Sequence, residues 1–133
     1  MAKNKIMLID DDQDLLQEFK EALDLSGYDV FAVSDSTVAV AAVLEQAPDL
    51  ILLDLSMPRK SGFQVAGELR KIPRLKHIPI IAITGFFTED EHSLLMNICG
   101  IKNCIKKPFD LADVIGKVEE ILKKKEELWQ RKY

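Results

Sequence analysis

The stretch KIMLIDDD, residues 5–12, is a short apolar run that ends in three consecutive aspartates. The same pattern returns at LILLD, residues 50–54, where an apolar run again ends in an acid. Short continuous apolar runs, without polar alternation, are typical of strands in a parallel sheet that is covered on both faces. Each run therefore predicts a buried strand that carries its acid to the end of the sheet.

The rest of the chain alternates between such runs and segments of helical spacing. The expected strands cover residues 6–9, 28–33, 50–53, 78–83 and, more weakly, 103–105. The expected helices lie around residues 15–23, 38–45, 63–70, 94–98 and 111–122, and helix-ending residues follow several of them: Gly27, Pro48, Pro73 and Gly100. Five strand–helix units in succession predict an α/β fold, a doubly wound parallel sheet with right-handed crossovers.

Length and composition limit the domain count and the class of partner. The chain has 133 residues, which suits one domain over residues 1–133, with its core at about 5–122 and a charged tail at 123–133 that extends the last helix or frays. Its 18 basic and 22 acidic residues give a net charge of −4. This balance argues against binding to nucleic acid or a membrane surface through bulk charge.

Targeting signals and cysteines indicate the compartment. The sequence contains no apolar stretch long enough to cross a membrane, and its amino terminus does not read as a signal peptide. Its two cysteines, Cys99 and Cys104, are expected to be free thiols in a reducing compartment. We therefore expect a soluble, cytoplasmic protein.

Polar side chains follow four of the predicted strands. Asp10 and Asp11 follow the first, Asp54 ends the third, Thr84 ends the fourth and Lys107 follows the fifth. Because the carboxyl ends of parallel strands share one edge of the sheet, these side chains should converge in a crevice there. Carboxylates at close range repel one another, and a divalent cation removes that conflict. Oxygen ligands in an incomplete protein cage favour Mg²⁺.

Phosphoryl transfer uses this combination of acids, metal, hydroxyl and lysine. Asp54 is the candidate nucleophile, which would form an aspartyl phosphate. Asp10 and Asp11 would hold the metal with Asp54, and the backbone carbonyl of Ser56 could complete the ligand set. Thr84 would donate its hydroxyl to a phosphoryl oxygen. Lys107 would bring a positive charge to the phosphoryl group and pair with Asp54 in its absence.

Two residues beside these candidates have other readings. Lys106 is a rival to Lys107, but Pro108 favours Lys107, and the alternation of side chains along a strand lets only one of the two face the pocket. Asp12 is as well suited to capping the first helix as to joining the acids, since aspartate is a preferred helix N-cap.

The motifs together resemble the receiver domains of two-component response regulators, in particular the chemotaxis-regulator type. The matching residues are D10-D11, D54-x-x-M57-P58, T84-G85 and K107-P108-F109, in the family's order, and the match covers about residues 5–122. The resemblance implies a flavodoxin-like sheet of strand order 2-1-3-4-5 with five helices. It also implies that Asp54 takes a phosphoryl group from the phosphohistidine of a sensor histidine kinase or phosphotransfer domain, with Mg²⁺ required. Such a domain is a phosphoryl acceptor with self-catalysed phosphorylation and dephosphorylation, rather than an enzyme.

The resemblance also implies how the signal is read. The surface around the fourth helix, fifth strand and fifth helix would switch for a downstream protein or a missing output domain, or form a homodimer. The domain itself would contact neither nucleic acid nor membrane. Family members usually carry an aromatic residue three positions before the lysine, and here that position is Cys104, so the switch pair is Thr84 and Cys104. Phe86 and Phe87 are candidate substitutes for that aromatic, and Ser56 and Phe86 border the path of the attacking water.

Three other functions compete with this interpretation. A small phosphatase with an aspartate nucleophile commonly has a second acid two residues later, where this chain has Ser56. A flavin-binding module of similar strand order would need a phosphate loop where this chain has three aspartates. A degenerate, non-phosphorylated interaction module is the third, and the complete set of acceptor residues argues against it.

Overall fold

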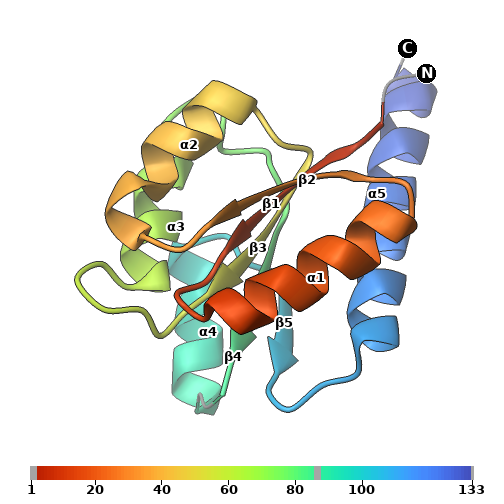
Figure 1. Cartoon of the computed structure of the whole chain (residues 1–133). Coiled ribbons are helices and arrows are strands. Elements are labelled where there is room, and N and C mark those ends of the chain that lie inside the picture. The colour runs from red at the N-terminus through yellow and green to blue at the C-terminus, as the bar shows by residue number, and fades with distance from the viewer. Residues whose placement is uncertain (1–2, 86–87, 133) are drawn as a thin grey trace.

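The computed structural model describes residues 3–85 and 88–132, with Glu91 placed by its backbone alone. Five strands and the helices between them alternate along the chain (Figure 1). The strands are β1 (Lys5–Ile9), β2 (Asp29–Val33), β3 (Leu50–Asp54), β4 (Ile80–Thr84) and β5 (Asn103–Lys106). The helices are α1 (Gln13–Leu25), the short 3₁₀ helix η1 (Ser36–Val38), α2 (Ala39–Gln46), α3 (Gly62–Arg70), α4 (Glu89–Ile98) and α5 (Leu111–Lys132).

The strands form one parallel sheet in the order β2-β1-β3-β4-β5. The first strand therefore lies between the second and the third, and the chain reverses its direction of winding there. Helices α1 and α5 cover one face, and α2, α3 and α4 cover the other (Figure 1). The predicted doubly wound, flavodoxin-like α/β fold with strand order 2-1-3-4-5 is confirmed.

Side chains of each strand alternate between two separate hydrophobic cores. In β1, Ile6 and Leu8 pack with α1 and α5, whereas Met7 and Ile9 pack with α2, α3 and α4. Strands β3 and β4 are buried along their whole length. Burial on both faces explains why these strands read as continuous apolar runs, since neither face can carry solvated side chains.

Several predicted boundaries differ from those in the structure. Strand β4 begins at Ile80 rather than at residue 78, after Pro79, which has no N–H to contribute to a ladder. Helix α4 begins at Glu89, well before the predicted residue 94, because its polar first turn carries no apolar periodicity. Helix α2 ends at Gln46, and Ala47, with a φ of 46°, turns the chain before Pro48.

The charged tail continues α5 as far as Lys132. Trp129, whose large apolar ring would favour packing against the domain, is 63% exposed, and Leu128 beside it is 64% exposed. The apolar stripe of α5 thus extends past the end of the hydrophobic core.

Arg70, at the end of α3, joins three segments through its guanidinium group. It donates to the carbonyls of Cys99 (2.9 Å) and Gly100 (3.3 Å) at the end of α4. It also donates to the carbonyls of Lys76 (2.9 Å) and Ile78 (2.9 Å) in the segment before β4. Burial lowers the pKa of the Arg70 guanidinium from its ordinary value. One planar group thereby satisfies four backbone acceptors, a geometry that a lysine ammonium cannot reproduce.

Replacing Arg70 by methionine is expected to lower the free energy of unfolding by about 2–4 kcal/mol, because partly buried carbonyls lose their donor. Urea unfolding at neutral pH measures the change. Arg74→Met is the matched control, since Arg74 is exposed on the segment after α3 and should change stability by less than about 0.5 kcal/mol. Equal losses in the two variants would contradict the anchoring role.

Candidate functional site

The carboxyl edge of the sheet collects the polar residues that the sequence analysis selected. Asp10 follows β1 directly, Asp54 is the last residue of β3, and Thr84 is the last residue of β4. All three side chains are buried, at 5%, 3% and 1% exposure. Polar groups this deeply buried need hydrogen-bond or charge partners, so their surroundings define the site.

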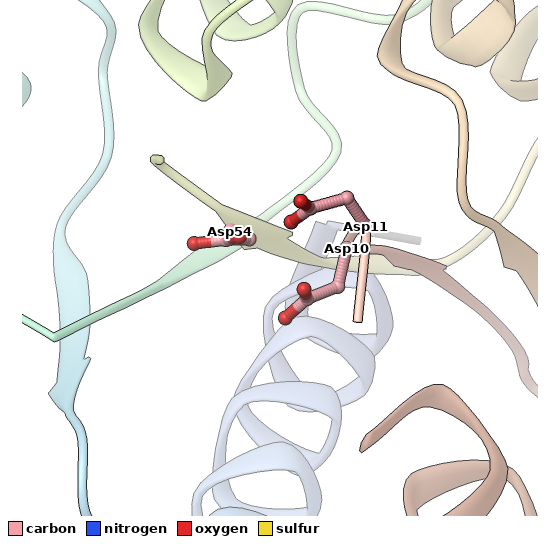
Figure 2. A group of neighbouring side chains, drawn as sticks. All are labelled: Asp10, Asp11 and Asp54. Atoms are coloured by element: carbon pink, nitrogen blue, oxygen red, sulfur yellow. The ribbon is translucent and has the colours of Figure 1, made fainter. Parts of the chain in front are cut away.

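Three carboxylates form one cluster at this edge. Ligand oxygens of Asp10, Asp11 and Asp54 all lie within 4.8 Å of one another. Figure 2 shows Asp10 and Asp11 extending from the loop after β1 on the same side as the end of β3, where Asp54 sits. Asp11 is exposed, whereas the other two acids are buried. The cluster is therefore open to solvent at Asp11 and closed around Asp54.

The protonation equilibrium of Asp54 reflects this crowding. Burial, followed by the charge of Asp10, raises the pKa of Asp54 to about 7. The N–H of Ser56, which donates to Asp54 Oδ1 at 3.1 Å, and the charge of Lys107 act in the opposite direction. The carboxyl group of Asp54 is thus poised to gain or lose a proton near neutral pH, and a nearby cation would favour its ionised form.

Lys107 reaches the acids, but its ion pair differs from the expected one. Its Nζ lies 3.5 Å from Asp10 Oδ2, so the expected ion pair with Asp54 is wrong for this structure. The backbone N–H of Lys107 donates to the Thr84 carbonyl at 2.7 Å, which fixes the residue beside the end of β4. Lys106 stands opposite Thr84 in the ladder and is exposed. Because successive side chains of a strand point to opposite faces, Lys107 faces the carboxylates and Lys106 does not.

Asp12 caps α1. Its Oδ1 accepts from the N–H groups of Asp14 (3.1 Å) and Leu15 (3.1 Å). Its own N–H donates to Asp10 Oδ1 at 3.0 Å, which orients the Asp10 carboxylate. Asp12 could either cap the first helix or join the cluster of acids, and the structure shows helix capping.

The proposed switch pair lies on adjacent strands. Cys104 stands opposite Ala82 in the β4–β5 ladder, two residues before the partner of Thr84. Since side chains two residues apart share a face of the sheet, Cys104 and Thr84 lie on the same face. Cys104 is half-buried against the core formed with α2, α3 and α4, and burial raises the pKa of its thiol. The candidate residues Phe86 and Phe87 lie outside the described residues.

Gly62, which the sequence analysis did not select, lies against the backbone of the acceptor strand. A Cβ at this position would overlap the carbonyl oxygen of Asp54 and lie 2.7 Å from Leu55 Cα. The Gly62 N–H also donates to the Leu55 carbonyl at 3.1 Å. Only glycine therefore allows α3 to begin so close to the end of β3. The sequence signal was a glycine at the first helical position, immediately after the N-cap Ser61.

A second unselected residue, Ser36, ties a neighbouring loop to the same region. Its buried hydroxyl donates to the Pro58 carbonyl at 3.0 Å. Asp35 and Arg59 form an exposed ion pair at 3.7 Å between the same two loops. Because Ser56 lies in the loop that contains Pro58, these contacts help to fix the backbone beside Asp54. A serine at the start of a short 3₁₀ helix carries no sequence pattern that would have predicted this contact.

Comparison with known proteins identifies the family. Residues 6–119 match the sequence profile of the response regulator receiver domain. The chain belongs to this family. Among curated relatives, it is 34% identical over 121 residues to the transcriptional regulatory protein CpxR of Klebsiella pneumoniae, an alignment that covers 91% of this chain and 50% of that protein. This receiver domain spans about half the length of the curated relatives it matches.

Solved structures agree with this membership. The receiver domain superposes on a response regulator receiver domain protein from Clostridium thermocellum with a TM-score of 0.84 and 29% identity, covering 94% of this chain and 98% of that one. A CheY-like receiver domain protein from Methanospirillum hungatei gives a TM-score of 0.88 at 24% identity, over 95% of this chain and 98% of that one, and supports the fold alone. Within the part of the receiver domain that the structure describes, no helix is both long and apolar enough to span a membrane.

Replacing Asp54 by asparagine is expected to stabilise the metal-free receiver domain at high pH. The folded state raises the pKa of Asp54 from 3.8 to about 7. The folded protein therefore binds more protons than the unfolded chain between these values, and the carboxyl group reduces stability as pH rises through that window. Urea unfolding with a chelator should show Asp54→Asn to be more stable than the parent by about 1–3 kcal/mol near pH 8 and similar to it near pH 4.

The matched control for this experiment is Asp29→Asn, at an exposed position on the edge strand β2. It should follow the parent curve at both pH values. A stability gain for Asp54→Asn that is the same near pH 4 as near pH 8 would contradict the assigned protonation behaviour.

Gly62→Ala is expected to destabilise the domain by about 2–4 kcal/mol, because its Cβ meets backbone that cannot move aside freely. Gly67→Ala is the matched control in the same helix, since a Cβ there meets nothing within 4 Å. It should leave stability unchanged or raise it by up to about 1 kcal/mol through helix propensity. Urea unfolding of both variants measures the difference, and similar stabilities would show that the close approach at Gly62 is unimportant.

Proposed function

We propose that Asp54 is the phosphoryl acceptor of this receiver domain and that the donor is a phosphohistidine of a sensor histidine kinase or phosphotransfer domain. The observation that carries the proposal is the carboxylate cluster of Asp10, Asp11 and Asp54 within 4.8 Å, with Lys107 at its border. Asp54 ends the central strand of the sheet, so its position is fixed by the core.

The donor set fits Mg²⁺. Asp10, Asp11 and Asp54 supply carboxylate oxygens, and the backbone carbonyl of Ser56 is the fourth proposed ligand. Magnesium accepts a small number of carboxylates together with water and phosphate oxygens. Burial, followed by the charge of Asp10, raises the pKa of Asp54 to about 7, so its ionised form is unfavourable without a nearby cation. A bound Mg²⁺ would compensate the charge of the carboxylates and of the incoming phosphoryl group.

In the proposed transfer, an oxygen of ionised Asp54 forms a bond to phosphorus as the phosphorus–nitrogen bond of the phosphohistidine breaks. The histidine leaves with the bond's electron pair and regains its neutral form by taking a proton. The product is an aspartyl phosphate. Positioning and charge stabilisation are the main contributions of a protein to such a step, and burial of Asp54 holds the nucleophile in one place.

Lys107 and Thr84 are proposed to act on the phosphoryl oxygens. The ammonium of Lys107, paired with Asp10 in this structure, would move to the developing negative charge. The hydroxyl of Thr84 would donate a hydrogen bond to a phosphoryl oxygen, and the resulting shift would be transmitted to Cys104. Hydrolysis of the aspartyl phosphate by water would reset the domain. In this proposal the residues of the domain itself catalyse both phosphorylation and dephosphorylation.

The surface of α4, β5 and α5 is the proposed site of signal output. Helix α4 carries three exposed large apolar side chains, Leu94 (44%), Met96 (45%) and Ile98 (67%), of which Leu94 and Ile98 share one helical face. Exposed apolar groups on one element favour a protein partner. We assign this surface to a downstream protein, an output domain or a second copy of the domain, in a cytoplasmic setting. The domain itself is expected to contact neither nucleic acid nor membrane.

Treatment with acetyl phosphate and Mg²⁺ is expected to add one phosphoryl group to the protein, and peptide mass spectrometry should place it on Asp54. Asp54→Asn should remain unlabelled. Asp11→Asn is the matched variant, since it keeps the acceptor and removes one proposed metal ligand. It should still be labelled, but the Mg²⁺ concentration for half-maximal labelling should rise about tenfold or more.

Equal labelling of Asp54→Asn and the parent protein would refute the acceptor assignment. Labelling of Asp54 that proceeds unchanged in a chelator would refute the metal role while leaving the acceptor role in place.

A further inference from the structure

The amino-terminal edge of the sheet, opposite the carboxylate cluster, has the reverse charge. Three adjoining grooves lie there, and His77 lines all of them. Among the described residues that line these grooves, seven are Lys or Arg and one, Glu120, is acidic. The whole chain carries 18 basic and 22 acidic residues. The positive charge of this edge is therefore a local concentration and does not follow from the composition.

The largest of these grooves, of about 520 Å³, runs along the second half of α5. Six residues of that helix line it, and four of them lie at positions that share one helical face: Lys117, Ile121, Lys124 and Leu128. Basic and apolar residues alternate along this face. The opposite wall includes Pro79 before β4 and Lys102 before β5. No residue of α4 is among the described residues that line this groove, so the groove uses the α5 side of the proposed output surface and not the exposed apolar side chains of α4.

Of the apolar side chains that line this groove, Leu128 is exposed, whereas Pro79 and Ile121 are partly buried. Leu128 is 64% exposed, although it continues the apolar stripe of α5. Lys117 and Lys124 share a single acid, Glu120, at 3.6 and 3.8 Å, which leaves the groove with a net positive charge. Lys125 donates to the Asp49 carbonyl at 3.2 Å and anchors the helix to the amino-terminal edge. The groove is thus held in place, positively charged and partly apolar.

We propose that this groove binds an acidic amphipathic helix of a partner protein. Helix-in-groove recognition requires apolar side chains at helical spacing, and Ile121 and Leu128, two turns apart, provide apolar contacts at that spacing. Glutamate or aspartate beside the partner's apolar positions would meet Lys117, Lys124 and Lys102. A nucleic acid would satisfy the lysines but would leave Leu128 exposed, so charge and apolar pattern together favour the helix.

The test is fluorescence anisotropy with a labelled synthetic peptide of about 16 residues, with leucines on one helical face and glutamates elsewhere. A peptide of the same composition with its leucines dispersed around the helix is the peptide control. The parent protein should bind the first peptide with a micromolar dissociation constant, and the second about tenfold more weakly or worse. The peptide lacks tryptophan, so the emission of Trp129, the single tryptophan of the chain and the neighbour of Leu128, gives a second readout.

Adjacent positions on α5 offer a matched pair of variants. Lys124→Glu reverses a charge in the groove, whereas Lys123→Glu makes the same change at an exposed position outside it. Lys124→Glu should weaken binding about fivefold to tenfold, and Lys123→Glu less than about twofold. Leu128→Ala should weaken binding about fivefold, and Leu25→Ala, at a 90% exposed leucine of α1, should not.

Equal binding of the two peptides, or equal losses for Lys124→Glu and Lys123→Glu, would overturn the proposal. Tighter binding of a short random-sequence DNA duplex than of the amphipathic peptide would show a general polyanion surface instead, and would overturn it as well. The measurement needs neither phosphodonor nor Mg²⁺. Its outcome is therefore separate from that of the acceptor assignment at Asp54.

Discussion

Charge repulsion among three carboxylates at the end of a buried sheet is the constraint on which the rest of the site depends. Asp10 and Asp54 are almost completely buried, and Asp11 brings a third acid within 4.8 Å. Such a group is unfavourable unless a proton, a lysine or a cation compensates it. Burial and then the charge of Asp10 raise the pKa of Asp54 to about 7, so a proton on Asp54 can relieve part of the repulsion, and the Lys107–Asp10 ion pair offsets the charge of Asp10. A cation at this edge would compensate the charge that remains.

Holding these acids together requires backbone contacts that are not themselves part of the chemistry. Asp12 caps α1 and orients Asp10 through one N–H. Gly62 lets α3 start against the carbonyl of Asp54. Ser36 ties the start of η1 to the loop after β3. Each contact fixes a backbone segment beside an acid, so the repulsion cannot be relieved by moving the acids apart.

The two edges of the sheet differ in charge. Acids gather where the strands end, and lysines and arginines gather where β4 and β5 begin and along the second half of α5. A parallel sheet covered by helices on both faces leaves these edges as the places where polar side chains from several strands can converge. One fold thus presents two edges of opposite charge.

The strand ends and their order along the chain could be predicted from the sequence, because apolar runs and helical spacing are local patterns. Asp10, Asp54, Thr84 and Lys107 were identified because each follows a recognisable run, and a parallel sheet must bring such residues to one edge. The start of α4 was missed, since its polar first turn has no apolar period.

The tertiary structure decided the features that depend on distances between segments. The ion pair of Lys107 with Asp10 joins the end of β5 to the loop after β1, two segments far apart in the chain. The roles of Gly62 and Ser36, and the basic groove of α5, arise from residues far apart in the chain. Sequence patterns report which residues are buried and where elements end, whereas contacts between elements depend on packing, which no local pattern contains.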